Sequence, residues 1–175
     1  ENGCVWEEPA SEEEAQMGGS AICDGIEGYP VYFAESDLRQ FTAYGFVEDP
    51  MLFPNGFSEW NSVYDTIEWR LEAGRPFATI HRWFLDNIDP ETGSADPARR
   101  GQVLMISTVG DPDAPAGKQI SCPAGYVDAL ANKHANILAR EVADTVGRYF
   151  LCGIDLPRFH GVRGERSGTP NDLGE

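Results

Sequence analysis

Basic residues are scarce in this 175-residue chain, which has 29 Asp and Glu but only 13 Lys and Arg. Lys118 and Lys133 are its only lysines, and the formal net charge is −16. A surface of this sign repels the phosphate groups of nucleic acids and of anionic lipids. We therefore expect no nucleic-acid partner, and the acidity leaves cationic partners, divalent metals or simple solubility as its reasons.

Long apolar runs are also missing, because no stretch approaches the roughly 18 apolar residues of a membrane-spanning helix. We therefore expect no membrane insertion. The chain opens with Glu-Asn-Gly-Cys and has neither an initiator Met nor the basic-then-apolar pattern of a secretory signal. This beginning predicts a mature chain from which a signal peptide has been removed.

Common sequence signatures of catalysis and zinc binding are absent. There is no Gly-x-Ser-x-Gly, no Gly-x4-Gly-Lys-Ser/Thr, no His-Glu-x-x-His and no Cys-x-x-Cys, and His81, His134 and His160 are scattered. These absences lower the expectation of an enzyme. Catalytic groups also assemble in space from distant parts of a chain, so an enzyme remains an alternative.

Four well-separated cysteines are present, and an even number fits two disulfides in an oxidising compartment. Four reduced, buried thiols in a cytosolic protein are the alternative. Of the three possible pairings, Cys4 with Cys23 and Cys122 with Cys152 is the one that closes only local loops, but the sequence does not decide between them. We predict this pairing and a periplasmic or secreted location.

The length and the 41% hydrophobic content predict one globular domain. Residues 1–27 are acidic and Gly-rich, and we expect a disulfide to tie them down. Residues 28–160 form the predicted α+β domain. Residues 161–175 are a Gly/Arg/Glu tail without apolar periodicity, which predicts disorder.

Within the domain, aromatic and β-branched residues predict strands at 29–34, 38–45 and 118–122, and a nearly all-apolar, central strand at 102–109. The clearest hairpin joins 66–71 to 75–84 through a turn that ends in Gly74. The pattern as a whole predicts an antiparallel sheet of about five or six strands.

One long amphipathic helix is expected near the C-terminus, beginning after Asn132 as N-cap and packing on this sheet. The side chains of its predicted packing stripe are Ala135, Leu138, Val142, Thr145, Val146 and Tyr149.

The polar face of the hairpin offers the best arrangement for catalysis. If Leu71 lies opposite Pro76, strict alternation places His81 beside Glu68 and Arg70, with Asp65 nearby. A histidine held by a carboxylate is a general base, and an adjacent Arg binds an anionic substrate. Charge pairs on a solvated sheet face give the same pattern more often. The predicted catalytic candidates are His81, Glu68, Asp65 and Arg70.

Aromatic residues are unusually frequent between 46 and 61 for a loop rich in Pro and Gly. They suggest a stacking platform for a ligand or a protein partner. The alternative is a lid that extends the core. The predicted binding residues are Phe53, Phe57, Trp60, Tyr64 and Trp83.

Calcium is the only cofactor for which the sequence offers ligands. Asp86, Asp89, Glu91 and Asp96 lie on a Pro/Gly loop, and carboxylates on such loops suit calcium. The EF-hand order is not met, because Ile88 occupies a ligand position. We expect no cofactor, with calcium binding as an alternative.

A resemblance to known proteins rests on four blocks of residues. They are Gly28-Tyr29-Pro30-Val31, Phe33 to Arg39, Asp65 to Arg70, and Ser121-Cys122 through Asp128-Ala129 to Cys152-Gly153. With these blocks, residues 28–160 resemble a group of uncharacterised secreted or periplasmic proteins of Gram-negative bacteria. The resemblance implies an envelope or secreted location and no particular activity.

We therefore predict a non-catalytic secreted or periplasmic protein that binds a protein partner or a small ligand through the aromatic loop and the hairpin face. The alternatives are a small periplasmic enzyme that uses the histidine and a carboxylate, and a calcium-binding envelope protein. The sequence gives no oligomeric state.

Overall fold

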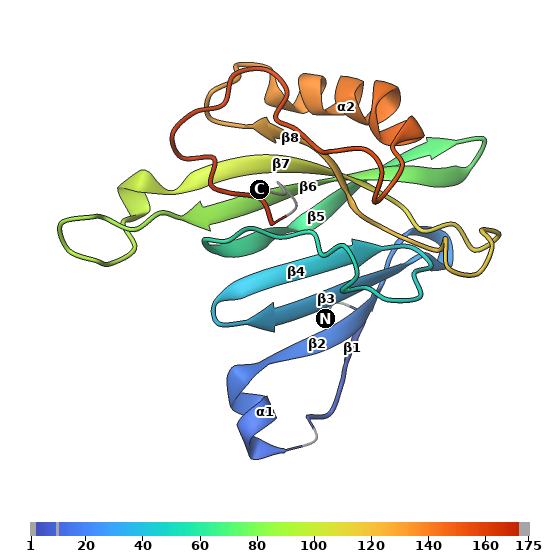
Figure 1. Cartoon of the computed structure of the whole chain (residues 1–175), viewed down its shortest axis with the longest axis horizontal. Coiled ribbons are helices and arrows are strands. Elements are labelled where there is room, and N and C mark those ends of the chain that lie inside the picture. Colours follow the sequence, from blue (N-terminus) through green and yellow to red (C-terminus); the bar gives the residue numbers. More distant parts are fainter. Residues whose placement is uncertain (1–2, 10, 172–175) are drawn as a thin grey trace.

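The computed structural model describes residues 3–9 and 11–171, and Figure 1 shows two sheets with a helix across the second. Both sheets have four antiparallel strands in sequence order. The α+β class and the C-terminal helix are confirmed, whereas the single sheet of five or six strands is replaced by two sheets of four. The first sheet comprises β1 (Cys4–Trp6), β2 (Gly18–Asp24), β3 (Pro30–Ser36) and β4 (Arg39–Tyr44). The second comprises β5 (Trp60–Glu72), β6 (Arg75–Asp86), β7 (Gly101–Thr108) and β8 (Pro123–Asp128).

The helices are fewer than the strands. The main one is α2 (Ala135–Thr145), and α1 (Glu12–Met17) joins β1 to β2. Three short 3₁₀ turns complete the regular structure of the described residues, at Ile26–Gly28, Pro97–Arg99 and Gly147–Tyr149.

Side-chain amides separate the two sheets where β4 meets β5. The backbone N–H of Gln40 donates to Oδ1 of Asn61 at 3.0 Å, and the N–H of Val63 donates to Oε1 of Gln40 at 2.8 Å. The N–H of Asn61 also donates to the carbonyl oxygen of Leu38, just before β4, at 3.0 Å, but β4 and β5 form no backbone ladder. The two sheets therefore meet at this junction, and residues 45–59 connect them along the chain.

The second sheet is covered on both faces, which explains the apolar run of β7. In Figure 1, orange α2 lies on the face turned away from the first sheet. There it packs against Ala78, Ile80, Leu104 and Ile106. The other face carries a second buried cluster made of Phe57, Trp83, Leu85, Val103, Met105 and Tyr126. The prediction that 102–109 is a central, buried strand is therefore confirmed.

The helix itself differs in detail from the prediction. Its N-cap residue is His134 rather than Asn132, and its fully buried side chains are Ala135, Ala139, Val142 and Ala143. Thr145 and Tyr149 of the predicted stripe are exposed. Small alanine side chains let a helix approach a sheet closely, so they carry the contact in place of the larger residues.

Both predicted disulfides are confirmed. Cys4 and Cys23 lie opposite each other on β1 and β2, and their bond closes the edge of the first sheet. The strands β1 and β2 on either side of this bond thus belong to the first sheet. The second bond joins Cys122, just before β8, to Cys152, just after the last 3₁₀ turn. It ties the edge of the second sheet to the end of the helical region.

The predicted disordered tail is instead packed as far as residue 171. The N–H of Tyr126 donates to the carbonyl oxygen of Arg158 at 3.0 Å, and that of Gly164 donates to Oδ2 of Asp128 at 2.9 Å. Further along, residues 169–171 pair with residues 56–58. Residues 172–175 lie outside the described part of the chain. The strand predicted at 118–122 is also shifted, because β8 begins at residue 123.

Candidate binding site

The hairpin does not bring together the predicted catalytic residues. Leu71 lies opposite Pro76, as predicted, but the next pair is Arg70 with Ala78. Phe77 is therefore an extra residue in β6, and this β-bulge inverts the alternation beyond it. As a result His81 lies opposite Ile67 and faces the first sheet.

His81 occupies a buried hydrogen-bonded chain between the two sheets. Its side chain is 3% exposed, with Nδ1 2.8 Å from the hydroxyl of Tyr44 and Nε2 2.6 Å from the carbonyl oxygen of Tyr64. The hydroxyl of Thr42 in turn donates to that of Tyr44. A neutral imidazole that donates through Nε2 and accepts through Nδ1 satisfies every member of this chain.

Burial shifts the pKa values of His81 and Tyr44 in this hydrogen-bonded series. It lowers the pKa of His81 to about 4, against weaker opposing effects of the Tyr64 hydrogen bond and the Asp65 charge. Burial also raises the pKa of Tyr44 far above its ordinary value. Asp65 is itself exposed. His81 is thus a neutral connection between the sheets, and both of its ring nitrogens are occupied.

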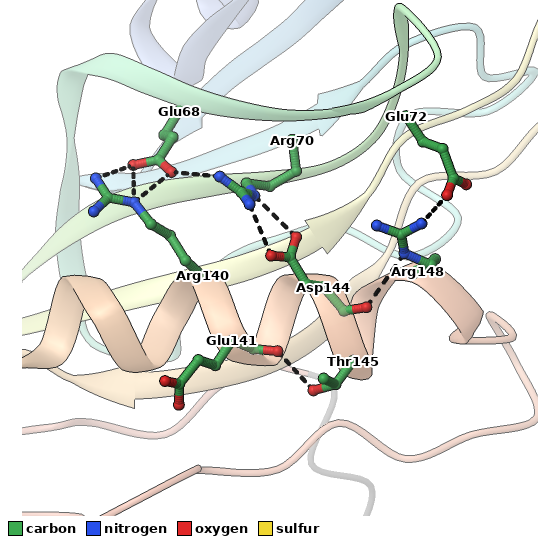
Figure 2. A network of polar contacts seen from close by, with 8 residues as sticks. All are labelled: Glu68, Arg70, Glu72, Arg140, Glu141, Asp144, Thr145 and Arg148. Atoms are coloured by element: carbon green, nitrogen blue, oxygen red, sulfur yellow. Dashed lines mark hydrogen bonds and ion pairs between the residues drawn. The ribbon is translucent and has the colours of Figure 1, made fainter.

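Glu68 and Arg70 face α2 instead, where they belong to a ladder of opposite charges (Figure 2). Nε and Nη2 of Arg140 each lie 2.8 Å from an oxygen of Glu68. Arg70 binds both oxygens of Asp144 through Nε and Nη2, at 3.0 and 2.7 Å. The hydrogen bond from Arg140 holds the pKa of Glu68 below its ordinary value.

The spacing of strand and helix explains this ladder, which Glu72 and Arg148 complete. Every second residue of a strand advances by about 6.7 Å, and every fourth residue of a helix by about 6 Å. Glu-x-Arg-x-Glu on β5 therefore matches Arg-x3-Asp-x3-Arg step by step, with Arg140 and Asp144 on α2 and Arg148 on the 3₁₀ turn that follows it. Both patterns are present in the sequence, and they bring Glu68 and Arg70 to the helix rather than to His81.

We expect the pair of Arg70 and Asp144 to stabilise the fold modestly. A double-mutant cycle with Arg70→Gln and Asp144→Asn should give a coupling of about 0.5–1 kcal/mol, because both side chains are partly solvated. Urea unfolding at low and high NaCl would measure it, and the coupling should shrink with salt. The same cycle at the exposed pair of Arg75 and Asp113 is the control. A larger coupling there would contradict this expectation.

The predicted aromatic platform is divided between core and surface. Phe57 and Trp83 are fully buried and pack at 5.6 Å between ring centroids. Phe53 and Trp60 are half-buried, and only Tyr64 is exposed, at 50%. The prediction that Phe57 and Trp83 belong to a binding surface is therefore wrong. Both side chains extend the core, as in the alternative interpretation of this loop.

The acidic loop after β6 engages its carboxylates in local contacts. Asp86 forms an ion pair with Arg100 at 3.2 Å. Oδ1 of Asp89 accepts the N–H of Glu91, and Oδ1 of Asp96 accepts that of Ala98. Across residues 3–9 and 11–171, no group of three or more His, Cys, Asp or Glu is placed to hold a metal ion. Calcium binding by this loop stays a prediction.

The outer face of the first sheet is a better candidate. Thr42 and Tyr44 point toward the second sheet, so the side chains that alternate with them on β4 point away from it. Residues opposite one another in a ladder share a face. The two rows on this outer face are Ile22, Tyr32 and Ala43, and Ser20, Ala34 and Phe41.

The segment after β4 folds over these rows as a roof. Residues 46–54 leave the end of β4 and return to its free edge, where Thr42 and Asn55 exchange backbone hydrogen bonds at 3.1 and 3.2 Å. Oδ1 of Asp49 accepts the N–H of Met51 at 2.8 Å and fixes the turn that carries Pro50. The roof therefore leaves a gap over the sheet rather than lying flat on it.

The gap is a hollow of about 320 Å³ lined by both rows, by Pro50 and Met51, and by Glu7. Its lining is mostly hydrocarbon, and Ile22 and Met51 are 44% and 49% exposed. The polar groups include the Glu7 carboxylate, which accepts a hydrogen bond from the hydroxyl of Ser20. The sequence prediction missed this hollow because it separated residues 1–27 from the domain, and β2 supplies one of its walls.

Comparison with protein-family models, with curated proteins and with solved structures found no match to the chain. The resemblance to secreted proteins of Gram-negative bacteria stays a prediction. Among the residues that the structure describes, no helix has the length and apolar content needed to cross a membrane.

Proposed function

We propose that this protein is an exported binding protein that takes a small apolar ligand in the hollow on the outer face of its first sheet. The observation that carries the proposal is the concave, mostly hydrocarbon lining between β2, β3, β4 and the 46–54 roof. Ligand sites are typically concave, apolar and roughly 300–1,000 Å³ in volume. The hollow is at the lower end of that range and suits one small molecule.

Two features of the roof support a ligand that enters and leaves. Met51 and Leu52 are 49% and 53% exposed on the turn above the hollow. The thioether chain of Met adapts to differently shaped apolar partners.

The two disulfides support export, because such bonds persist mainly in oxidising compartments.

The alternative of an enzyme that uses the histidine and a carboxylate has less support. His81 is bonded to Tyr44 and to Tyr64, and Glu68 to Arg140 and Arg70, on opposite faces of the hairpin. None of these residues lines the hollow. Binding without a reaction therefore accounts better for the geometry.

The proposal predicts that the protein binds the neutral fluorescent probe N-phenyl-1-naphthylamine saturably, in a one-to-one ratio. Ala34→Trp should weaken this binding at least about tenfold, a loss of about 1.4 kcal/mol, because the indole fills the hollow. Met51→Asp, at an exposed position, should also weaken it by placing a charge at the mouth. Fluorescence titration measures all three affinities.

The matched control is Ile137→Trp, which adds an indole to the exposed face of α2 on the other sheet. It should leave the affinity unchanged. Thermal unfolding of each variant shows that it is folded. If the probe does not bind, or binds all variants equally well, the proposed site is wrong.

A further inference from the structure

Acidic charge is concentrated in the part of the chain that builds the hollow. Residues 1–60 contain 13 of the 29 acids but only one of the 13 bases, so they carry −12 of the formal −16. The single base is Arg39. Its guanidinium is already engaged by the carboxylate of Asp37 and, at 2.8 Å, by the carbonyl oxygen of Ser58. The first sheet therefore offers no available cation to an anionic ligand.

Glu7 places one of these acids at the hollow itself. It is the only Asp, Glu, Lys, Arg or His among the residues that line it, and its carboxylate accepts a hydrogen bond from Ser20. Glu7 also borders a second hollow of about 650 Å³, whose lining includes Trp6, Glu35 and Asp37. The carboxylates of Glu35 and Asp37 in this second lining are bonded to Gln40 and Arg39, which leaves Glu7 as the acid that faces the first hollow.

We propose that the ligand of this site is an amphiphilic cation, which inserts its apolar part under the 46–54 roof and holds its ammonium or guanidinium group beside Glu7. This inference rests on the proposed function and adds the charge of the ligand to it. The surplus of acids attracts such a molecule from a distance, and the carboxylate of Glu7 orients it. An anionic amphiphile of equal length meets repulsion at the same place.

The test compares three ligands with the same twelve-carbon chain, each displacing N-phenyl-1-naphthylamine below its micelle concentration. They are dodecyltrimethylammonium, dodecanol and dodecanoate. At 0.01 M salt the cation should displace the probe at a concentration about tenfold lower than dodecanol, and dodecanoate should be the weakest. At 1 M salt the three should converge, because the Debye length falls from about 30 Å to about 3 Å.

Glu7→Gln separates the site from the general charge of the protein. It should reduce the ratio between cation and alcohol to about twofold, whereas Glu141→Gln, on the exposed face of α2, should leave the ratio unchanged. Equal displacement by all three ligands at low salt would overturn the inference and leave the apolar site standing. An unchanged ratio in Glu7→Gln would also overturn it. Failure of the probe to bind would remove the proposed function as well.

Discussion

Lowering the pH from 6.5 to 4 should cost the folded protein about 3 kcal/mol through His81 alone. The ordinary pKa of histidine is 6.5, and burial lowers that of His81 to about 4. Between these two pH values the unfolded chain binds a proton at this histidine and the folded protein does not. The free energy of unfolding therefore decreases as the pH decreases. The gap between the two pKa values corresponds to about 3 kcal/mol.

His81→Gln should remove this part of the pH dependence. Glutamine can donate to the carbonyl oxygen of Tyr64 and accept from Tyr44 without titrating. The measurement is the unfolding free energy in urea at several pH values from 7 to 4, for the native protein and the variant. The unfolding free energy of the native protein minus that of the variant should fall by about 3 kcal/mol between pH 7 and pH 4.

His134→Gln is the matched control, because His134 is exposed and its side chain makes no capping hydrogen bond. This variant should follow the native curve. Parallel curves for the native protein and His81→Gln would show that His81 is not a neutral, buried connection between the sheets.

Removal of the Cys122–Cys152 disulfide should destabilise the protein by about 3.5 kcal/mol. The bond closes a loop of 30 residues, and the chain-entropy model gives that value for such a loop. Typical domains have only about 5–15 kcal/mol of stability, so the loss is a large fraction of the total. Cys122→Ala with Cys152→Ala is the suitable pair, because Cys122 is buried and a serine there would hide a hydroxyl.

The comparison that isolates this effect is Cys4→Ala with Cys23→Ala, which opens a loop of 19 residues. Its expected cost is about 3 kcal/mol by the same model. Urea unfolding measures both, and peptide mapping of each variant confirms that the remaining bond is intact. If the variant without Cys122 and Cys152 were as stable as the native protein, the bond would not stabilise the fold as expected.

Local patterns predicted much of this fold because they depend on neighbouring residues. The hairpin turn at Gly74, the apolar strand β7 and the C-terminal helix follow from periodicity and turn chemistry alone. The disulfide pairing agreed with loop length. The junction of β4 and β5 depends on two side-chain amides, Gln40 and Asn61, which replace backbone pairing and leave no periodic signal.

The predicted catalytic arrangement and the hollow were harder to predict. The first depended on a single residue, and the second depends on several separate segments. One extra residue, Phe77, moved His81 to the opposite face of the hairpin and separated it from Glu68. A bulge of this kind has no reliable mark in one sequence. The hollow is formed jointly by β2, β3, β4 and the 46–54 roof, so no single stretch of the sequence predicts it. The alternation of Phe41 and Ala43 against Thr42 and Tyr44 was the available signal.

The segment from Arg158 to His160 also affects whether two molecules can associate through their strand edges. An unpaired strand edge is a template on which a second chain can add, and long exposed edges promote aggregation. Arg158 and His160 occupy both backbone groups of Tyr126 at the outer edge of β8, at 3.0 and 2.8 Å. The segment therefore acts as a guard against edge-to-edge association, which an acidic surface alone opposes only at low ionic strength.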